Sequence, residues 1–202
     1  MENLKKMLES VAGRATDVPK VFFDEDSIKW GEEFDEKIYD CIMSSCFFIP
    51  LYYDNYLSME KLWCARELYH AIKVERMIRD NSNTQFCFIL PLIHYGNKEN
   101  LPECINSKNA KSLRPYIQDI TKSQPSSVTK KIIDFRNEIY DILKAHHHHV
   151  KHISENDIKK WCEDINIPSD EDIKEWIIEN NKNLRKQEES NLPKLQKNAE
   201  RH

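Results

Sequence analysis

Hydrophobic residues in the first 150 positions follow two alternating patterns. Apolar side chains recur at the spacing of amphipathic helices in four segments: residues 4–11, 34–45, 62–79 and 128–146. Short β-prone runs lie between them, at residues 20–23, 46–51 and 86–93, and the last two are continuously apolar. Such runs are typical of strands that are buried on both faces. Strands that alternate with helices predict βαβ units, and hence an α/β fold with a parallel sheet covered by helices on both faces.

The stretch before the last of these helices is less regular. Residues 94–112 show no clear periodicity and are predicted to be irregular. Residues 114–120 suggest a short strand at the edge of the sheet.

The pattern changes again after His152. Ser154 is followed three positions later by an acidic residue, and Ser169 repeats this arrangement, which is typical of a capping box at a helix start. We therefore predict a domain over residues 1–150, and a helical extension with a charged tail over residues 151–202. The two helices carry enough apolar surface to pack on each other, on a partner protein or on the flank of the domain. We expect the domain to fold without them.

Composition and charge exclude several classes of partner. The net charge is only −4 and the basic residues are spread along the chain, which argues against a nucleic-acid partner. No apolar run approaches the ~18–20 residues that cross a bilayer, and no signal peptide follows Met1. Six scattered cysteines without a CxxC pair are typical of reduced thiols. We therefore expect a cytoplasmic protein without a membrane partner.

Two clusters of potential metal ligands occur in the sequence, and neither has the pattern of a metal site. Consecutive residues of a helix point about 100° apart, so the side chains of residues 146–149 cannot all face one ion. Only pairs such as His148 and His152 share a face. The carboxylates of residues 24–26 are typical of a solvated loop. The sequence therefore predicts no metal site. The three glycines and the absence of GxGxxG or GKS/GKT also disfavour a glycine-rich phosphate loop.

The candidate chemistry lies in two other segments. The polar loop of residues 24–31 follows an apolar run, and ligands of parallel sheets bind at the carboxyl ends of strands. Trp63 and Glu67 are four residues apart, so on a helix their side chains share one face. A carboxylate beside an indole can hold a flat cationic ribosyl base and stabilise positive charge on its sugar. The alternative is that Glu67 is a solvated charge on a helix face.

Together these segments resemble a TIR (Toll/interleukin-1 receptor) domain of the prokaryotic NAD-consuming kind, over residues 2–146. Residues 21–24 (VFFD) resemble the opening of the BB loop, residues 54–58 (DNYLS) are similar to SPNYLxS, and residues 63–68 (WCAREL) match WCxxEL. The resemblance implies a flavodoxin-like parallel sheet with flanking helices. One departure is that the chain begins directly in the first helix, so the first strand of the family is missing.

By this resemblance Glu67 corresponds to the catalytic glutamate, and Phe34 and Trp63 to residues that contact substrate. Trp30 has no firm counterpart, but it stands where an indole can stack on a base. The alternatives are that Phe34 is the first core residue of its helix and that Trp63 is structural. NAD+ is then the substrate and no cofactor is required.

The resemblance implies NAD+ nucleosidase activity, or NAD-derived signalling, in bacterial immunity against phage. A non-catalytic TIR module for assembly is the alternative. The resemblance also implies self-association through residues 24–31. A second protein could bind the C-terminal helices. No residue indicates whether the product is ADP-ribose or a cyclic form, or what triggers the reaction.

Overall fold

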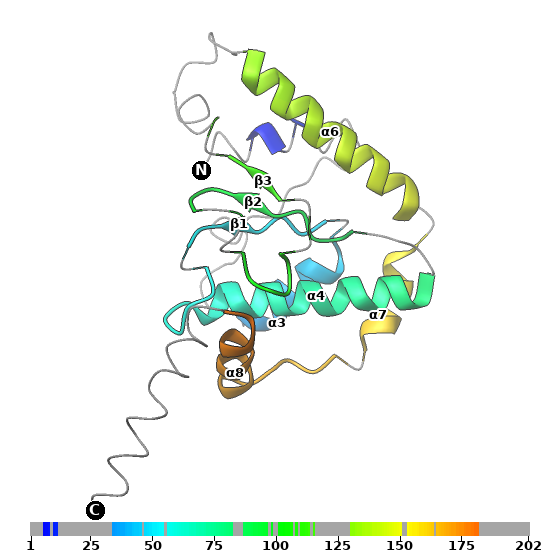
Figure 1. The fold of residues 1–202 in the computed structure, drawn as a ribbon. Coiled ribbons are helices and arrows are strands. Elements are labelled where there is room, and N and C mark those ends of the chain that lie inside the picture. Colours follow the sequence, from blue (N-terminus) through cyan, green and yellow to red (C-terminus); the bar gives the residue numbers. More distant parts are fainter. Residues whose placement is uncertain are drawn as a thin grey trace, which may run out of the picture.

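The computed structural model describes residues 6–8, 10–11, 34–45, 47–54, 56–82, 87–96, 98, 101–106, 108, 110–113, 115, 130–150, 153–163 and 165–181. In chain order it contains α3 (Phe34–Met43), β1 (Leu51–Tyr52), α4 (Leu62–Ser82), β2 (Leu92–Ile93), β3 (Lys111–Ser112), α6 (Lys130–Val150), α7 (Glu155–Cys162) and α8 (Asp170–Asn180) (Figure 1). Residues 6–8 and 10–11 are also helical.

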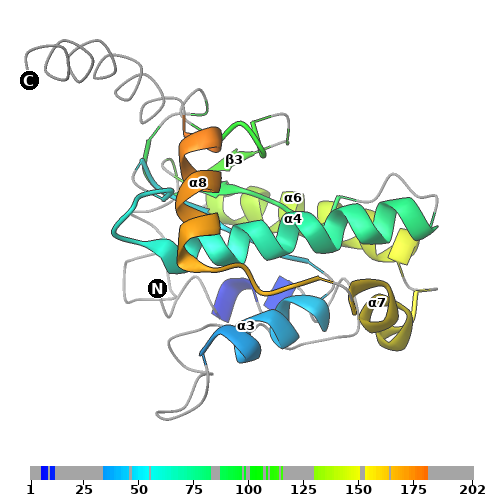
Figure 2. The same cartoon turned by 90° about the horizontal axis from the view of Figure 1, so that it is seen from below.

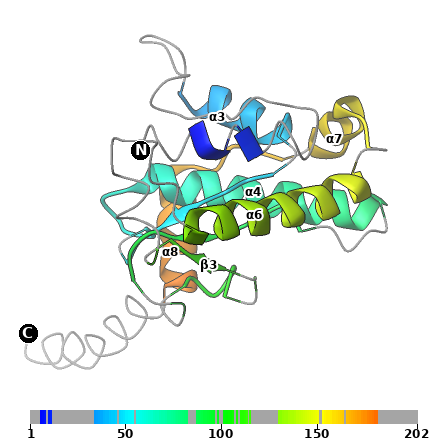
Figure 3. The same ribbon diagram turned by 90° about the horizontal axis from the view of Figure 1, so that it is seen from above.

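The strands form a small parallel sheet in the order β1–β2–β3. Tyr52 pairs with Ile93, Leu92 pairs with Lys111, and an isolated parallel bridge between Phe48 and Ile89 extends the first pairing. Helices α4 and α6 lie on opposite faces of this sheet and run in a similar direction (Figures 1 and 3). The predicted α/β fold with a helix-covered parallel sheet is confirmed for the described part of the chain.

Most of the predicted elements are found close to their predicted places. Helices α3, α4 and α6 coincide with the predicted segments, and α4 and α6 each continue a few residues further. The last strand is an exception, because β3 lies at residues 111–112 inside the stretch predicted to be irregular. Its backbone is held by the sheet: the N–H groups of Lys111 and Leu113 donate to the carbonyls of Pro91 and Ile93. The predicted strand at residues 20–23 lies outside the described residues.

Helix α4 is the centre of the larger hydrophobic core. Its residues Ala65, Leu68, Ala71, Val74 and Ile78 are almost completely buried. The sheet covers one side, α3 packs along a second, and α7 and α8 cover the remainder (Figure 2). On the other face of the sheet a smaller cluster joins α6 to the helical residues near the amino terminus.

Both helices of the extension begin with the predicted capping box. The N–H of Asp157 donates to Ser154 Oγ at 3.1 Å, and the N–H of Ser154 donates back to the Asp157 carboxylate at 3.1 Å. Ser169 and Asp172 repeat both hydrogen bonds at the start of α8. Each box satisfies backbone donors that a helix start would otherwise leave without a partner.

The extension packs on the flank of the domain, which is one of the placements that the sequence left open. Ile173 and Ile177 of α8 are fully buried in the same cluster as the core of α4. The Tyr39 hydroxyl of α3 donates to the carbonyl of Cys162, the last residue of α7, at 3.0 Å. This packing argues against the expectation that the domain folds without the extension.

Replacing Ile173 by alanine should destabilise the whole protein. Ile173 is 0% exposed, and truncating a fully buried isoleucine costs about 2 to 5 kcal/mol. Urea unfolding measures this loss, and Ile167→Ala provides the control because Ile167, on the linker between α7 and α8, is 42% exposed. Equal stability of the two variants would mean that the extension is dispensable.

A buried carboxylate ties α4 to the sheet. Glu75 is only 5% exposed, and its Oε2 accepts the N–H groups of Phe88 at 2.8 Å and Ile89 at 3.0 Å. Its other oxygen forms an ion pair with Lys108, from the stretch before β3. One side chain therefore joins α4, the segment that leads into β2 and the connection before β3. Its buried charge is matched by these partners.

Glu75→Gln should cost about 1 to 3 kcal/mol of stability, because it leaves the ammonium of Lys108 mostly buried without an opposite charge. Thermal and urea unfolding test this. Glu138→Gln is the matched control, because the Glu138–Lys111 pair is more exposed and should contribute less than about 1 kcal/mol. An equal effect of both changes would contradict the structural role of Glu75.

Candidate functional site

The candidate site lies where the connections after β1 and β2 meet the first turns of α4 (Figure 1). Residues 53–54 and 56–61 follow β1, and residues 94–96 and 101–106 follow β2. Both connections leave the carboxyl edge of the parallel sheet, which is where ligands bind in folds of this kind.

Glu67 occupies the amino-terminal end of a core-facing row on α4. Residues four, seven and eleven positions later share its face, and these are Ala71, Val74 and Ile78, all buried. Glu67 itself is partly buried. Its place differs from that of a solvated helix-face charge, because its neighbours along the row are the core of the domain.

Tyr56 lies within electrostatic reach of this carboxylate. Its side chain is buried in the hydrophobic core, and burial raises the pKa of its hydroxyl well above the ordinary value. The negative charge of Glu67 is the next largest cause of the raised pKa, so the two groups lie within electrostatic reach of each other. The partly buried Glu67 carboxylate is therefore within electrostatic reach of a buried side chain.

Two further tyrosines, Tyr52 and Tyr53, pack around Tyr56 on this side of the site. The ring centroids of Tyr52 and Tyr53 are 5.9 Å and 5.8 Å from that of Tyr56. Burial, followed by the charge of Asp54, raises the pKa of Tyr52 to about 12. In the sequence, Tyr56 stands out only within the DNYLS motif. The close spacing of three tyrosines directly after the apolar run of residues 46–51 is the signal that points to the cluster.

The connection after β1 is fastened to the start of α4. The Lys61 ammonium donates to the Tyr53 hydroxyl at 3.2 Å and stands 4.5 Å from the centroid of the same ring. The Tyr53 oxygen is 3.8 Å from the sulfur of Cys64. These contacts hold the connection against the first turn of α4, immediately before Glu67.

A glycine brings the second connection close to the first. Gly96 has φ of +106°, a backbone conformation that favours glycine, and a Cβ there would lie 2.1 Å from an Asp54 carboxylate oxygen. The N–H groups of His94 and Tyr95 both donate to the Tyr52 carbonyl, at 2.8 Å and 3.3 Å. The two connections therefore form one continuous rim.

Trp63 lies in the first turn of α4, as predicted, and its side chain is 51% exposed. The guanidinium of Arg66 lies 5.7 Å from the centroid of its ring system. The indole is therefore held from one side and accessible to solvent, as a surface for a flat ligand requires.

The remaining predicted site residues are only partly described. Phe34 begins α3, as predicted, but its side chain lies outside the described part, as do Trp30 and residues 24–31. Helices α3 and α4 run in the same direction, and the Tyr39 and His70 rings pack 4.8 Å apart (Figure 2). The start of α3 consequently lies at the same edge of the sheet as the start of α4.

The end of α8 borders the site as well. The amide of Asn181 donates to the Leu57 carbonyl at 2.8 Å, and the N–H of Glu103 donates to the Asn180 carbonyl at 3.1 Å. The extension thus contacts both connections that form the rim. Nothing in the sequence pattern pointed to this contact.

Within the described residues, no group of three or more histidines, cysteines or carboxylates is arranged to hold a metal ion. The cysteines in this part of the chain are free thiols. A search of its helices for one long and apolar enough to cross a membrane found none.

No protein-family model, curated protein or solved structure matches this chain. The function must therefore be argued from the residues at the site and from their arrangement.

Alkaline titration should reveal the buried tyrosines. Burial raises the pKa values of Tyr39 and Tyr52 to about 12, and it raises the pKa of Tyr56 well above the ordinary value. An unfolded tyrosine ionises near pH 10, so the stability that these groups provide is complete below about pH 10. It is lost as the pH rises from about 10 toward 12.

Phenolate absorbance, followed in buffer and in denaturant, measures this difference. The native protein should ionise some of its tyrosines only at the upper end of that range, and Tyr56→Phe should remove one of these late groups. Complete ionisation near pH 10 in the native protein would contradict the buried environment beside Glu67.

Proposed function

We propose that this chain is a TIR-type NAD+ nucleosidase in which Glu67 is the catalytic carboxylate. The observation that supports this most is the position of Glu67. It is partly buried beside Tyr56, at the start of the core-facing row of α4 and at the carboxyl edge of the parallel sheet. The WxxxE spacing that singles out Glu67 is also the motif on which the family resemblance places the catalytic glutamate.

The reaction needs few groups from the protein. The nicotinamide of NAD+ is a positively charged pyridinium, so it leaves ribose as a neutral molecule and requires no general acid. The barrier is the positive charge that grows on the ribose as it becomes oxocarbenium-like. Where water forms the new bond to the ribose carbon, ADP-ribose, nicotinamide and one proton result; where a nitrogen of the same molecule forms it, the products are a cyclic ADP-ribose and nicotinamide.

Glu67 suits this task through its surroundings. A carboxylate that is sheltered from bulk water interacts more strongly with a developing positive charge than a solvated carboxylate does. The buried tyrosines on one side supply this shelter. The half-exposed indole of Trp63 offers a face for a flat or cationic ring.

Other parts of the proposal extend beyond the described residues. We assign Phe34 and Trp30 to the nucleotide pocket, and self-association to residues 24–31. Consumption of NAD+ would then serve bacterial immunity against phage, with assembly as the step that switches on activity. NAD+ turnover should accordingly rise with protein concentration.

A second candidate function is a non-catalytic assembly module. Met59, Trp63 and Tyr95 are all exposed apolar side chains, and all three stand at the carboxyl edge of the sheet. Such a group of residues favours contact with another protein. Full assembly without any NAD+ consumption would favour this candidate.

Glu67→Gln separates the two candidates. The change keeps the size of the side chain but removes its charge, so NAD+ cleavage should fall by at least about 10²-fold, as on loss of one preorganised electrostatic group. The melting temperature should barely move. Product release is measured by chromatography over a range of protein concentrations.

Glu60→Gln is the control, because Glu60 is an exposed carboxylate just before α4. It should retain the turnover of the unchanged protein. If Glu67→Gln retained it as well, the assignment of Glu67 would be wrong.

A further inference from the structure

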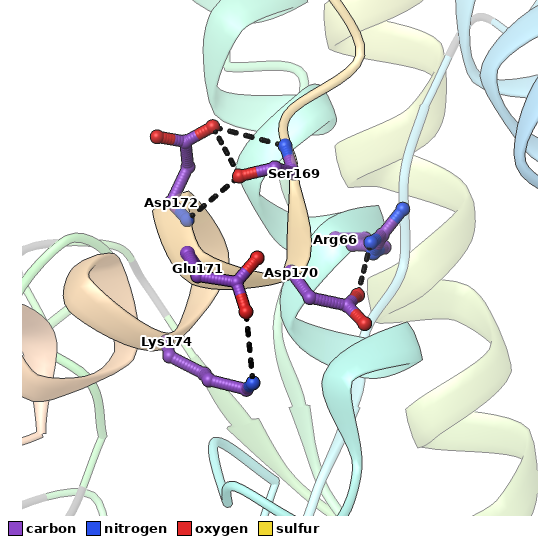
Figure 4. Close-up of polar contacts among 6 residues, drawn as sticks. All are labelled: Arg66, Ser169, Asp170, Glu171, Asp172 and Lys174. Carbon is purple, nitrogen blue, oxygen red and sulfur yellow. Dashed lines mark hydrogen bonds and ion pairs between the residues drawn. The ribbon is translucent and has the colours of Figure 1, made fainter.

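An ion pair connects the extension to the start of α4. The carboxylate of Asp170, the first residue of α8, contacts the guanidinium of Arg66 (Figure 4). The Arg66 side chain is 11% exposed and that of Asp170 is 54% exposed. The two residues are 104 positions apart in the chain. The contact therefore depends wholly on the docking of α8.

Arg66 is also the residue that contacts the predicted substrate-binding tryptophan. Its guanidinium lies 5.7 Å from the centroid of the Trp63 ring system, and Arg66 immediately precedes Glu67. A planar guanidinium can hold an aromatic face and a carboxylate at the same time. Asp170 and Trp63 are therefore linked through one nearly buried side chain.

The position of Asp170 is itself well determined. The capping box of Ser169 and Asp172 fixes the backbone on both sides of it (Figure 4). Further along α8, the Trp176 ring packs edge-on against Tyr69 of α4, with centroids 5.6 Å apart. The Asp170 carboxylate is thus presented to Arg66 by a helix that is anchored along its length.

The neighbouring acidic residue behaves differently. Glu171 forms its ion pair within α8, with Lys174 at 3.5 Å, and both side chains are largely exposed. Glu171 shares with Asp170 the favourable place of an acid in the first turn of a helix. It does not reach α4 through this pair. Asp170 and Glu171 therefore have different ion-pair partners, but both place a negative charge in the first turn of α8.

We propose that Asp170 is a positioning residue for the NAD+ site, and that it acts through Arg66 on the orientation of the Trp63 indole. This inference rests on the proposed function. It gives the C-terminal extension a role in the reaction beyond its contribution to the core. A half-exposed indole can adopt several rotamers, and a fixed guanidinium at its side reduces that freedom before substrate binds.

Because Trp63 is assigned to binding, loss of the Asp170 charge should affect binding more than chemistry. Asp170→Asn should raise KM for NAD+ by about two- to fivefold, the scale of one partly exposed ion pair, with kcat unchanged. Asp170→Glu should recover most of the loss, because it restores the carboxylate. The effect should diminish at high salt, which screens such a pair.

Glu171→Gln is the matched control, because it removes an equal charge from the same helical turn. It should leave KM and kcat unchanged. A second readout does not depend on activity. Of the four indole N–H signals in the NMR spectrum, that of Trp63 is identified by its loss in Trp63→Phe. This signal should move in Asp170→Asn and stay in place in Glu171→Gln.

The outcomes separate this inference from the proposed function. If the unchanged protein consumed no NAD+, the proposed function would fail, and the Trp63 signal would still decide whether Asp170 positions the indole. An unmoved Trp63 signal in Asp170→Asn would overturn the inference. So would a loss of kcat and melting temperature without a change in KM, since that pattern indicates a structural role alone.

Discussion

The burial of α4 is the constraint on which the rest of the structure depends. A helix at the surface of a domain buries one stripe, but α4 buries side chains around most of its circumference, against the sheet, α3, α7 and α8. Much of the middle of α4 therefore serves the core. The first turns of α4 also lie at the carboxyl edge of the parallel sheet. The candidate site is therefore at the one end of α4 where binding residues and ligand can meet.

Two glutamates of α4 show how surroundings decide the role of a side chain. Glu75 lies in the middle of the helix, where two backbone N–H groups and Lys108 satisfy its carboxylate. The role of Glu75 is therefore structural, because all of these contacts connect α4 to other segments of the chain. Glu67, two turns earlier, lies at the rim beside a buried tyrosine. A carboxylate in that position can act on a ligand's charge, and this difference underlies the assignment of Glu67 to chemistry.

The C-terminal extension contributes to both the core and the site. Its buried isoleucines complete the cover of α4, and the end of α8 contacts both connections of the rim. Asp170 reaches Arg66 at the start of α4. The extension and the domain therefore share one core, and α8 contacts residues that surround the proposed substrate site. Two capping boxes make this possible, because they fix where each helix begins.

The sequence by itself determined the local features of this protein. The helices, both capping boxes, and the shared face of Trp63 and Glu67 follow from spacing over a few residues, because helical geometry is set by neighbours in the chain. The tertiary structure alone decided the place of β3, the Glu75–Lys108 pair and the docking of α8 through Asp170 and Arg66. Each of these depends on segments far apart in sequence. The packing of the whole chain determines which of these segments meet, and a pattern over a few neighbouring residues does not contain that information.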